Sequence, residues 1–468
     1  MKVLLINPPW TIDSKSVWSV INPCYPSLGL LYIAGVLLKN GHDVTIIDAR
    51  AEQLTRETLR ARLVALKSIP DFIGLTATTR IINNALESAR ICRGVFPRAR
   101  IVFGGVHPTL MPEEVLSNDF VDFVIRDEGE FAMNELVSGR PLNEILGLSY
   151  KEGRGFIHNG RRPFLANLDD LPLLPTYLLP MKRYHPALGA YKRLPAFGLV
   201  AARGCPGRCT YCYQNFGPRI RYHSARRLVE QIRELQKNHK IREISFYDDT
   251  FTAVRENVRE FCRLIKAGNI NLTLSCFSRV DCVDQEILQA LKDAGCHQIL
   301  FGVESADPQI LQNIKKRINL ERVEEVMKMT KGVGINCRLT FMFGNQGETE
   351  ETMEKTLKYA IKLDPDVVVF NITTPFPGTE VFKWADENGY LKTKDWSQYN
   401  FAQPILELPT VSSAKVEEFY KKAFRKFYFR PRYLLRRLYK ISAYDANTLK
   451  AALKFFFRWI LGFREEGI

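Results

Sequence analysis

The stretch Arg203-Gly204-Cys205-Pro206-Gly207-Arg208-Cys209-Thr210-Tyr211-Cys212 brings three cysteines together with the spacing C-x3-C-x2-C. It follows directly on the apolar run 197–202, which is typical of a buried strand. Three thiolates on one loop can hold three irons of a [4Fe–4S] cluster and leave the fourth iron open to a substrate. A zinc knuckle is the alternative, but zinc usually takes four protein ligands from paired spacings, and no second pair lies nearby. We therefore expect Cys205, Cys209 and Cys212 to bind an iron–sulfur cluster.

The cysteine loop opens a series in which apolar strand patterns alternate with amphipathic helix patterns. Six such βα units predict a partial (β/α) barrel over residues 191–385, with its active site at the carboxyl ends of the strands. The expected strands are 197–202, 243–247, 272–276, 298–301, 336–343 and 366–371, and the expected helices lie near 224–238, 254–267, 285–294, 320–332 and 349–362.

A similar alternation fills residues 1–140 and predicts a separate α/β domain. Five strand-and-helix units are typical of a flavodoxin-like Rossmann domain, which binds ligands outside the carboxyl ends of its parallel strands. Residues 141–190 are rich in glycine and proline and are expected to form a linker. The strands are expected at 3–6, 44–47, 72–76, 101–103 and 123–125, and the helices near 28–40, 56–68, 81–95, 111–117 and 130–137.

The composition agrees with a folded chain of several domains. Of the 468 residues, 46% are hydrophobic and 25% are charged. No apolar run reaches the roughly 18 residues that span a bilayer, and the apolar start ends at Asn7-Pro8-Pro9, unlike a signal peptide. We therefore expect a cytoplasmic protein, in which scattered cysteines are small buried hydrophobes. That interpretation covers Cys24, Cys92, Cys262, Cys276, Cys282, Cys296 and Cys337.

The cysteine motif after the first barrel strand resembles the radical S-adenosylmethionine (radical SAM) superfamily. The Rossmann unit, Leu168-Asp169-Asp170-Leu171-Pro172 and Phe246-Tyr247-Asp248-Asp249-Thr250-Phe251 resemble its cobalamin-binding-domain branch, over about residues 1–385. The resemblance implies an enzyme that cleaves SAM and functionalises an unactivated carbon of a small molecule, chiefly by cobalamin-dependent C-methylation. It also implies a flavodoxin- or ferredoxin-type electron donor. Cyclisation or oxidation, a lost cobalamin site and a non-catalytic cluster-binding protein stay open as alternatives.

The same resemblance carries SAM-binding roles onto individual barrel positions. Asp248 and Asp249 end the second strand, where carboxylates suit the ammonium group of SAM. Two of the remaining positions flank the end of the third strand, one follows the fourth and one lies on the fifth, and structural hydrogen bonding or ion pairing is their alternative role. They are Ser275, Arg279, Glu304 and Arg338.

Cobalamin would lie at the post-strand loops of the Rossmann domain, where glycines let a bulky corrin approach the backbone. The Asp-x-His-x-x-Gly pattern that supplies the lower cobalt ligand elsewhere is absent after the first strand, so we expect no histidine on cobalt. The residues that the resemblance implies for cobalamin are Thr78, Gly104, Gly105, His107, Glu128 and Gly129.

The C-terminal segment, residues 386–468, is expected to be mainly helical and strongly basic. From Lys415 onward it has 14 basic and 5 acidic residues, so it carries +9 of the net charge of +15. Its aromatic and basic residues interleave over 419–463, which suits peripheral contact with an anionic membrane and an apolar substrate. A helical cap packed on the barrel is the alternative. The basic tail also suits RNA, but we expect no nucleic-acid partner.

Overall fold

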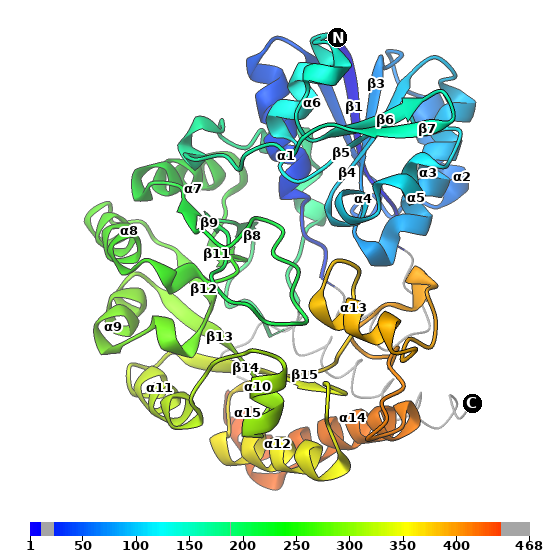
Figure 1. Cartoon of the computed structure of the whole chain (residues 1–468). Coiled ribbons are helices and arrows are strands. Elements are labelled where there is room, and N and C mark those ends of the chain that lie inside the picture. Colours follow the sequence, from blue (N-terminus) through cyan, green and yellow to red (C-terminus); the bar gives the residue numbers. More distant parts are fainter. Residues whose placement is uncertain (11–22, 188, 441–468) are drawn as a thin grey trace.

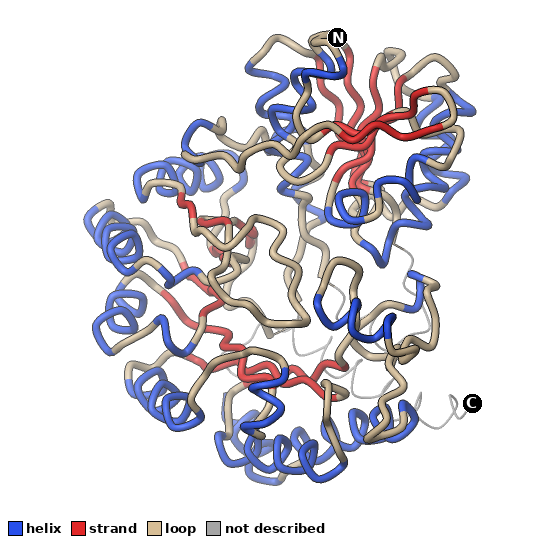
Figure 2. Tube along the Cα trace, viewed as in Figure 1, coloured by secondary structure: helices blue, strands red, loops and turns tan. Residues whose placement is uncertain are grey.

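The computed structural model describes residues 1–10, 23–187 and 189–440, which form two α/β domains and a helical cap (Figure 1). In both domains the strands lie inside and the helices lie outside (Figure 2). Within the described residues no helix is long and apolar enough to cross a membrane.

The N-terminal domain is built on a sheet of seven strands in the order β2-β1-β3-β4-β5-β6-β7. The first five are parallel and confirm the doubly wound sheet. Alternate residues of β1 face opposite sides: Val3 and Leu5 pack with α1 and α6, while Leu4 and Ile6 pack with α2 and α3. The elements are β1 (Lys2–Asn7), α1 (Leu28–Lys39), β2 (Asp43–Asp48), α2 (Arg56–Val64), β3 (Phe72–Thr76), α3 (Ile82–Val95), β4 (Arg100–Gly104), α4 (Val106–Leu110), α5 (Pro112–Leu116), β5 (Phe123–Ile125) and α6 (Glu130–Val137).

The start of the expected linker belongs to this sheet, which corrects the sequence interpretation. β6 (Leu148–Glu152) pairs antiparallel with β5, and β7 (Gly155–His158) pairs with β6. Leu148 and Tyr150 of β6 are buried, so the hairpin covers the open edge of β5. The glycines that suggested a linker, Gly153 and Gly155, lie at the turn and start of β7. The irregular connection is therefore shorter than expected.

The second domain is an open barrel of six parallel strands in the order β15-β14-β13-β12-β11-β8, as predicted. Its strands are β8 (Ala196–Leu199), β11 (Glu243–Phe246), β12 (Thr273–Ser278), β13 (Cys296–Glu304), β14 (Asn336–Phe343) and β15 (Val367–Ile372). The helices outside them are α7 (Ala225–His239), α8 (Arg255–Ala267), α9 (Gln285–Asp293), α10 (Pro308–Asn313), α11 (Leu320–Gly332) and α12 (Glu350–Leu363).

Side chains alternate along each barrel strand between the helices and the interior. On β14, Cys337, Leu339 and Phe341 are fully buried among apolar neighbours, whereas Arg338 and Thr340 are partly exposed on the opposite, inner side. This alternation delivers polar groups to the barrel interior. Side-chain caps fix where the helices begin: Ser224, Asp284, Asn319 and Thr349 each accept from a backbone N–H of the first turn.

The described part of the C-terminal segment is the helical cap that the sequence left open as an alternative. Its helices are α14 (Ser413–Tyr428) and α15 (Pro431–Lys440), and α13 (Glu380–Glu387) precedes them at the end of the barrel domain. The apolar face of α14 packs on α12 and β15, and Phe419 and Phe427 are buried there. Phe419 and Phe427 are therefore not available for the expected contact with a membrane. Residues 441–463 of the same expected surface lie outside the described residues.

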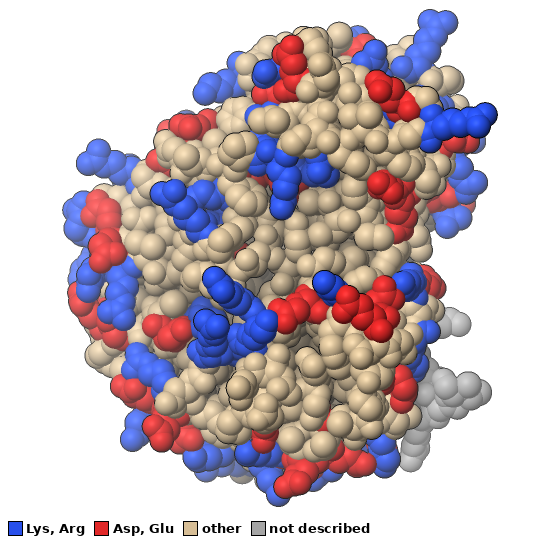
Figure 3. Space-filling model, viewed as in Figure 1, with Lys and Arg blue, Asp and Glu red and all other residues tan. Residues whose placement is uncertain are grey.

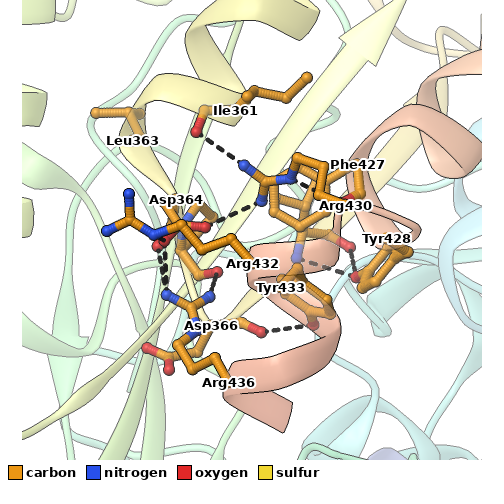
Figure 4. A network of polar contacts seen from close by, with 12 residues as sticks. Ile361, Leu363, Asp364, Asp366, Phe427, Tyr428, Arg430, Arg432, Tyr433 and Arg436 are labelled. Atoms are coloured by element: carbon orange, nitrogen blue, oxygen red, sulfur yellow. Dashed lines mark hydrogen bonds and ion pairs between the residues drawn. The ribbon is translucent and has the colours of Figure 1, made fainter.

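A carboxylate at the end of α12 fastens the cap (Figure 4). Arg430 and Arg436 donate to opposite oxygens of Asp364 at 3.0 and 2.8 Å, and the Tyr433 hydroxyl donates to the Asp366 carbonyl at 2.9 Å. Asp364 has a positive φ of 45°, a conformation that asparagine also tolerates.

Asp364→Asn should loosen α15, because it keeps the backbone conformation but removes the charge that two arginines share. We expect a cost of about 1–2 kcal/mol for these partly buried bonds. Trypsin should then cleave α15 about 5- to 30-fold faster. Glu324→Gln, which breaks the exposed pair with Lys362, is the control and should leave the rate unchanged. Equal rates for the two variants would show that Asp364 does not hold the cap.

Candidate active site

A short antiparallel ribbon carries the cysteine loop. β9 (Ala202–Arg203) pairs with β10 (Arg221–Tyr222), and the loop between them holds all three motif cysteines. Gly204 has a φ of 103°, and a side chain there would collide with the Arg219 carbonyl. Glycine at this position therefore lets the chain turn directly into the motif.

The cysteines gather around Gly207. A Cβ on that glycine would lie 3.3 Å from the Cys205 Sγ and 3.9 Å from the Cys209 Sγ. Cys212 is exposed as a residue, but desolvation of its thiol and the neighbouring Cys209 raise its pKa to about 12, so a metal must displace this proton on binding. Within the described residues no three His, Cys, Asp or Glu side chains are arranged to hold a single metal ion. The cluster assignment rests on the motif and its place in the fold.

Directly behind the loop lies a buried ion pair. Lys316 Nζ is 3.0 Å from Glu304 Oε1 and 3.4 Å from the Tyr211 hydroxyl, and the Thr340 hydroxyl also donates to Glu304. Glu304 has a positive φ of 72° and Lys316 is only 7% exposed. Burial lowers the Lys316 pKa, but the charges of Glu304 and Cys209 and the hydrogen bond to Glu304 together outweigh it, so the net shift is upward. Lys316 was missed in the sequence, where it is one of three consecutive cations.

The two carboxylates that end β11 lie in different surroundings. Asp248 is buried and accepts from the backbone N–H groups of Ala201 and Ala202, which braces the end of β8 against β11. Desolvation raises its pKa to about 7 despite these bonds. Asp249 is exposed, and its carboxylate has no hydrogen-bond partner among the described residues. Asp249 is therefore the carboxylate that is open to a ligand, while the bonds of Asp248 are structural.

The other three SAM candidates also differ in their partners. The Ser275 hydroxyl donates to Ser245 at 2.9 Å, and Arg279 makes two bonds to Asp281 at 2.9 and 2.7 Å beside the cysteine loop. Arg338 makes no hydrogen bond or ion pair within the described part of the chain, although its Nε is buried. A partly buried guanidinium without a partner is unfavourable, so Arg338 is suited to bind an anionic group of a ligand.

A cavity of about 180 Å³ opens where the carboxyl ends of β1, β3, β4 and β5 meet the barrel. Apolar residues of the sheet and of α1 line it, together with Gly74, Gly104, Gly105 and Gly129. On the barrel side, Arg203 and the loop residues Asn215 and Phe216 complete its wall. The cavity thus lies between the glycine-rich strand ends of the N-terminal domain and the cysteine loop of the barrel domain.

Two residues expected at cobalamin, His107 and Thr78, do not line this cavity, and their roles at cobalamin stay predictions. His107 is fully buried: its Nδ1 lies 3.2 Å from the Thr79 hydroxyl, and its ring meets Trp396 edge-on at 5.6 Å. Thr78 is exposed before the short 3-10 turn Thr79–Ile81. His107 therefore helps to dock the segment around Trp396 onto the N-terminal domain, a contact across 282–289 residues that no local pattern signals.

Glu128 lines the cavity, but its carboxylate is paired with two arginines of the barrel domain. Arg203 donates to Glu128 at 2.8 Å and to Glu130 at 2.6 Å, and Arg221 donates to Glu128 at 2.9 Å. All four side chains are at most 6% exposed. The resemblance implied a cobalamin contact for Glu128, but the local sequence does not reveal its two arginine partners.

The loop after β14, which resembles the family's Gly-x-Pro-Gly-Glu-Thr loop, contains a fully buried acid. Glu348 accepts from the Asn345 backbone at 2.9 Å and from its side chain at 3.1 Å, but its Oε1 has no partner. Desolvation raises the pKa of Glu348 to about 8.

Glu348→Gln should remove a pH dependence of stability. The folded protein keeps the Glu348 proton up to about pH 8, whereas the unfolded chain releases it near its ordinary pKa of 4.5. This contribution to stability is complete below pH 4.5 and is lost as the pH rises toward 8. Between pH 5 and 8 the wild type should therefore lose on the order of 3 kcal/mol relative to the variant in urea unfolding. Glu351→Gln, at an exposed position, is the control. If the free energy of unfolding changes with pH in the same way in wild type, Glu348→Gln and Glu351→Gln, Glu348 does not have the raised pKa.

Comparison with known proteins assigns a family to each of the two domains. Residues 199–360 match the model of the radical SAM superfamily, and residues 15–137 match that of the B12 binding domain. An uncharacterized methyltransferase of Pyrococcus horikoshii is 36% identical over 94% of this chain and 95% of its own. The anaerobic magnesium-protoporphyrin IX monomethyl ester cyclase of Rubrivivax gelatinosus is 28% identical over 97% of this chain and 82% of its own.

Among solved structures, the radical SAM methyltransferase TsrM of Kitasatospora setae, with cobalamin and a [4Fe–4S] cluster bound, has the same fold. It superimposes with a TM-score of 0.68 at 20% identity, over 84% of this chain and 76% of its own. The chain belongs to the radical SAM superfamily, in the family of cobalamin-dependent methyltransferases that also contains cyclases. It is an enzyme whose cofactors are a [4Fe–4S] cluster, SAM and cobalamin, as the sequence predicted.

Proposed function

We propose that this enzyme methylates an unactivated carbon of a small molecule, with SAM as the methyl source and cobalamin as the methyl carrier. The observation that carries the proposal is the shared wall of the cavity, built by strand ends of the B12-binding domain and by Arg203 and Phe216 of the cysteine loop. A transfer that uses both cofactors needs them as neighbours. The relative at 36% identity, itself named a methyltransferase, supports the same reaction.

The cysteine loop fits a cluster with an open iron. Cys205, Cys209 and Cys212 are its protein ligands, and no fourth cysteine belongs to the motif. When bound, the cluster supplies the electron for reductive cleavage of SAM. The protein's own part is to position: Gly207 keeps the space between the sulfurs clear, and the Gln214 amide donates to the Cys205 carbonyl at 3.0 Å and so steadies the loop.

The cavity fits a flat apolar part of cobalamin, such as its aromatic base. Gly74 opens the cleft: a Cβ there would lie 2.8 Å from Leu5 Cδ2 and 3.8 Å from Met133 Cε, both cavity residues. Gly104 and Gly105 leave the rim free of side chains. None of the seven histidines, all of which are described, lines the cavity, so we propose a cobalt without a histidine ligand.

SAM would lie between the cysteine loop and the inner face of the barrel. Asp249 offers an unpaired carboxylate to its ammonium group, and Arg338 offers an unpaired guanidinium to its carboxylate. Lys316 holds Glu304 at the same side of the loop, so that this carboxylate keeps its orientation. The roles of Ser275 and Arg279 at SAM stay predictions.

Aromatic side chains line the barrel near its carboxyl end and support an apolar substrate. Tyr247 meets Tyr25 of the N-terminal segment at 4.9 Å and Phe277 at 5.3 Å between ring centroids. Such a wall keeps water away from the reacting groups, which a reactive radical requires.

We propose that an acidic flavodoxin- or ferredoxin-type protein of the cytoplasm donates the electron to the cluster. Figure 3 shows Lys and Arg side chains on one side of the hollow in the middle of this face, with Asp and Glu side chains on the other side. Three arginines on the loops that border the cysteines, Arg208, Arg219 and Arg317, are exposed. A basic surface beside the cluster loop suits an acidic partner.

Methyl-labelled SAM tests the reaction. The protein, reconstituted anaerobically with iron, sulfide and cobalamin, is incubated with a reductant, the labelled SAM and a small-molecule extract of the source cells. We expect a compound that gains the label and disappears when cobalamin is omitted. A changed compound without label would instead favour cyclisation or oxidation, the second candidate, which the 28% identical cyclase supports.

A further inference from the structure

The cysteine loop is closed at its base by two cations. Arg203 and Arg221 are register partners in the ribbon of β9 and β10, and every ligand of the motif lies between them. Like charges directly opposite each other on paired strands repel. The two side chains are 5% and 6% exposed, so solvent cannot screen their guanidinium groups. The ribbon therefore needs a buried anion to close.

That anion comes from the other domain. Glu128, in the loop after β5, accepts from Arg203 at 2.8 Å with one oxygen and from Arg221 at 2.9 and 3.0 Å with both. Glu130 adds a second carboxylate on Arg203 at 2.6 Å, so the two charges of each sign balance. One residue of the B12-binding domain thus holds both ends of the cluster loop.

The same residues form part of the cavity wall. Glu128, Glu130 and Arg203 all line the cavity, and Arg203 is separated from the ligand Cys205 by Gly204 alone. Arg203 also lies against the Tyr32 ring of α1, with its guanidinium carbon 5.1 Å from the centroid. A group that fills the cavity therefore touches the side chains that set the position of the loop.

We propose that Glu128 is a positioning residue that clamps both ends of the cysteine loop and makes cobalamin binding and cluster assembly thermodynamically coupled. The proposal rests on the cofactor sites of the proposed function. By linkage, each cofactor then strengthens the other by the same factor. In allosteric proteins one ligand typically changes the affinity of another by about 5- to 150-fold, and we expect a change in cofactor affinity of this size.

Cobalamin affinity, measured by equilibrium dialysis with and without a reconstituted cluster, tests the clamp. For the wild type we expect dissociation constants that differ at least 5-fold between the two states. In Glu128→Gln the ratio should fall toward one, while each cofactor still binds alone. Glu128→Gln leaves Arg203 and Arg221 with Glu130 as their only carboxylate. Arg203→Lys therefore serves as a second variant, because a lysine keeps the positive charge but cannot bond to Glu128 and Glu130 at the same time.

The control is Arg161→Lys, which alters an exposed arginine paired with Asp127 on the same loop as Glu128 and should leave the ratio as in the wild type. The reduced-cluster electron paramagnetic resonance (EPR) spectrum gives a second readout, which should change on adding cobalamin in the wild type and not in Glu128→Gln. A wild type that binds both cofactors independently overturns the clamp alone. A wild type that binds neither overturns the proposed function as well.

Discussion

Replacing Cys205, Cys209 and Cys212 together with alanine is expected to lower the iron content of the reconstituted protein from about four per chain to background. The reason is that the loop then offers no thiolate, and within the described residues no other His, Cys, Asp and Glu cluster is arranged to hold a metal. SAM cleavage to 5′-deoxyadenosine should fall to the level of free reductant. Iron analysis and the visible absorption of the cluster measure the first loss, and mass spectrometry measures the second.

Cys282 provides a matched control for this experiment. It lies close enough to Cys205 for their charges to interact, and burial raises its pKa to about 11, yet it is outside the motif. Cys282→Ala should keep the full iron content and the full rate of SAM cleavage. Iron retained by the triple variant, or lost from Cys282→Ala, would contradict the assignment of the ligands.

Filling the cleft in the N-terminal domain is expected to abolish cobalamin binding and to spare the cluster. Gly74→Val adds an isopropyl group where its Cβ alone would lie 2.8 Å from Leu5 Cδ2. The sheet can yield slightly, at a cost of about 1–3 kcal/mol, but a ligand cannot share the space. We expect cobalamin affinity to drop by at least about 100-fold, or about 2.7 kcal/mol, in equilibrium dialysis.

Gly94→Ala is the control, because a Cβ on that glycine of α3 meets nothing within 4 Å. It should bind cobalamin as the wild type does. Both variants should contain the same iron as the wild type, which shows that the fold of the barrel is intact. Wild-type affinity in Gly74→Val would mean that cobalamin does not enter this cleft.

The strands of both domains could be predicted because burial on two faces makes a parallel strand a short, continuous apolar run. The runs at 72–76 and 123–125 match β3 and β5 residue for residue. The hairpin of β6 and β7 was missed because it lies at the sheet edge, where the polar residues Lys151, Glu152 and His158 are exposed and interrupt the apolar pattern. Its glycines then looked like those of a linker.

The cysteines could be predicted because their spacing is local, whereas the rest of the site depends on contacts between distant segments. Glu128 meets Arg203 across 75 residues, and only the folded chain shows that the acid neutralises the base of the cluster loop. Lys316 looked like part of a solvated basic run, but the turn after α10 buries it beside Glu304. His107 looked like a pocket residue because the contact with Trp396 is equally remote.

The central claim is that the two domains bring both cofactors to one space between the cysteine loop and the B12-binding domain. EPR of protein that holds cob(II)alamin together with the cluster tests it most directly. We predict that reducing the cluster, which turns it from diamagnetic to paramagnetic, broadens the cob(II)alamin signal and speeds its relaxation. A cob(II)alamin signal that is identical with oxidised and reduced cluster would mean that the cofactors lie apart, and would contradict the account.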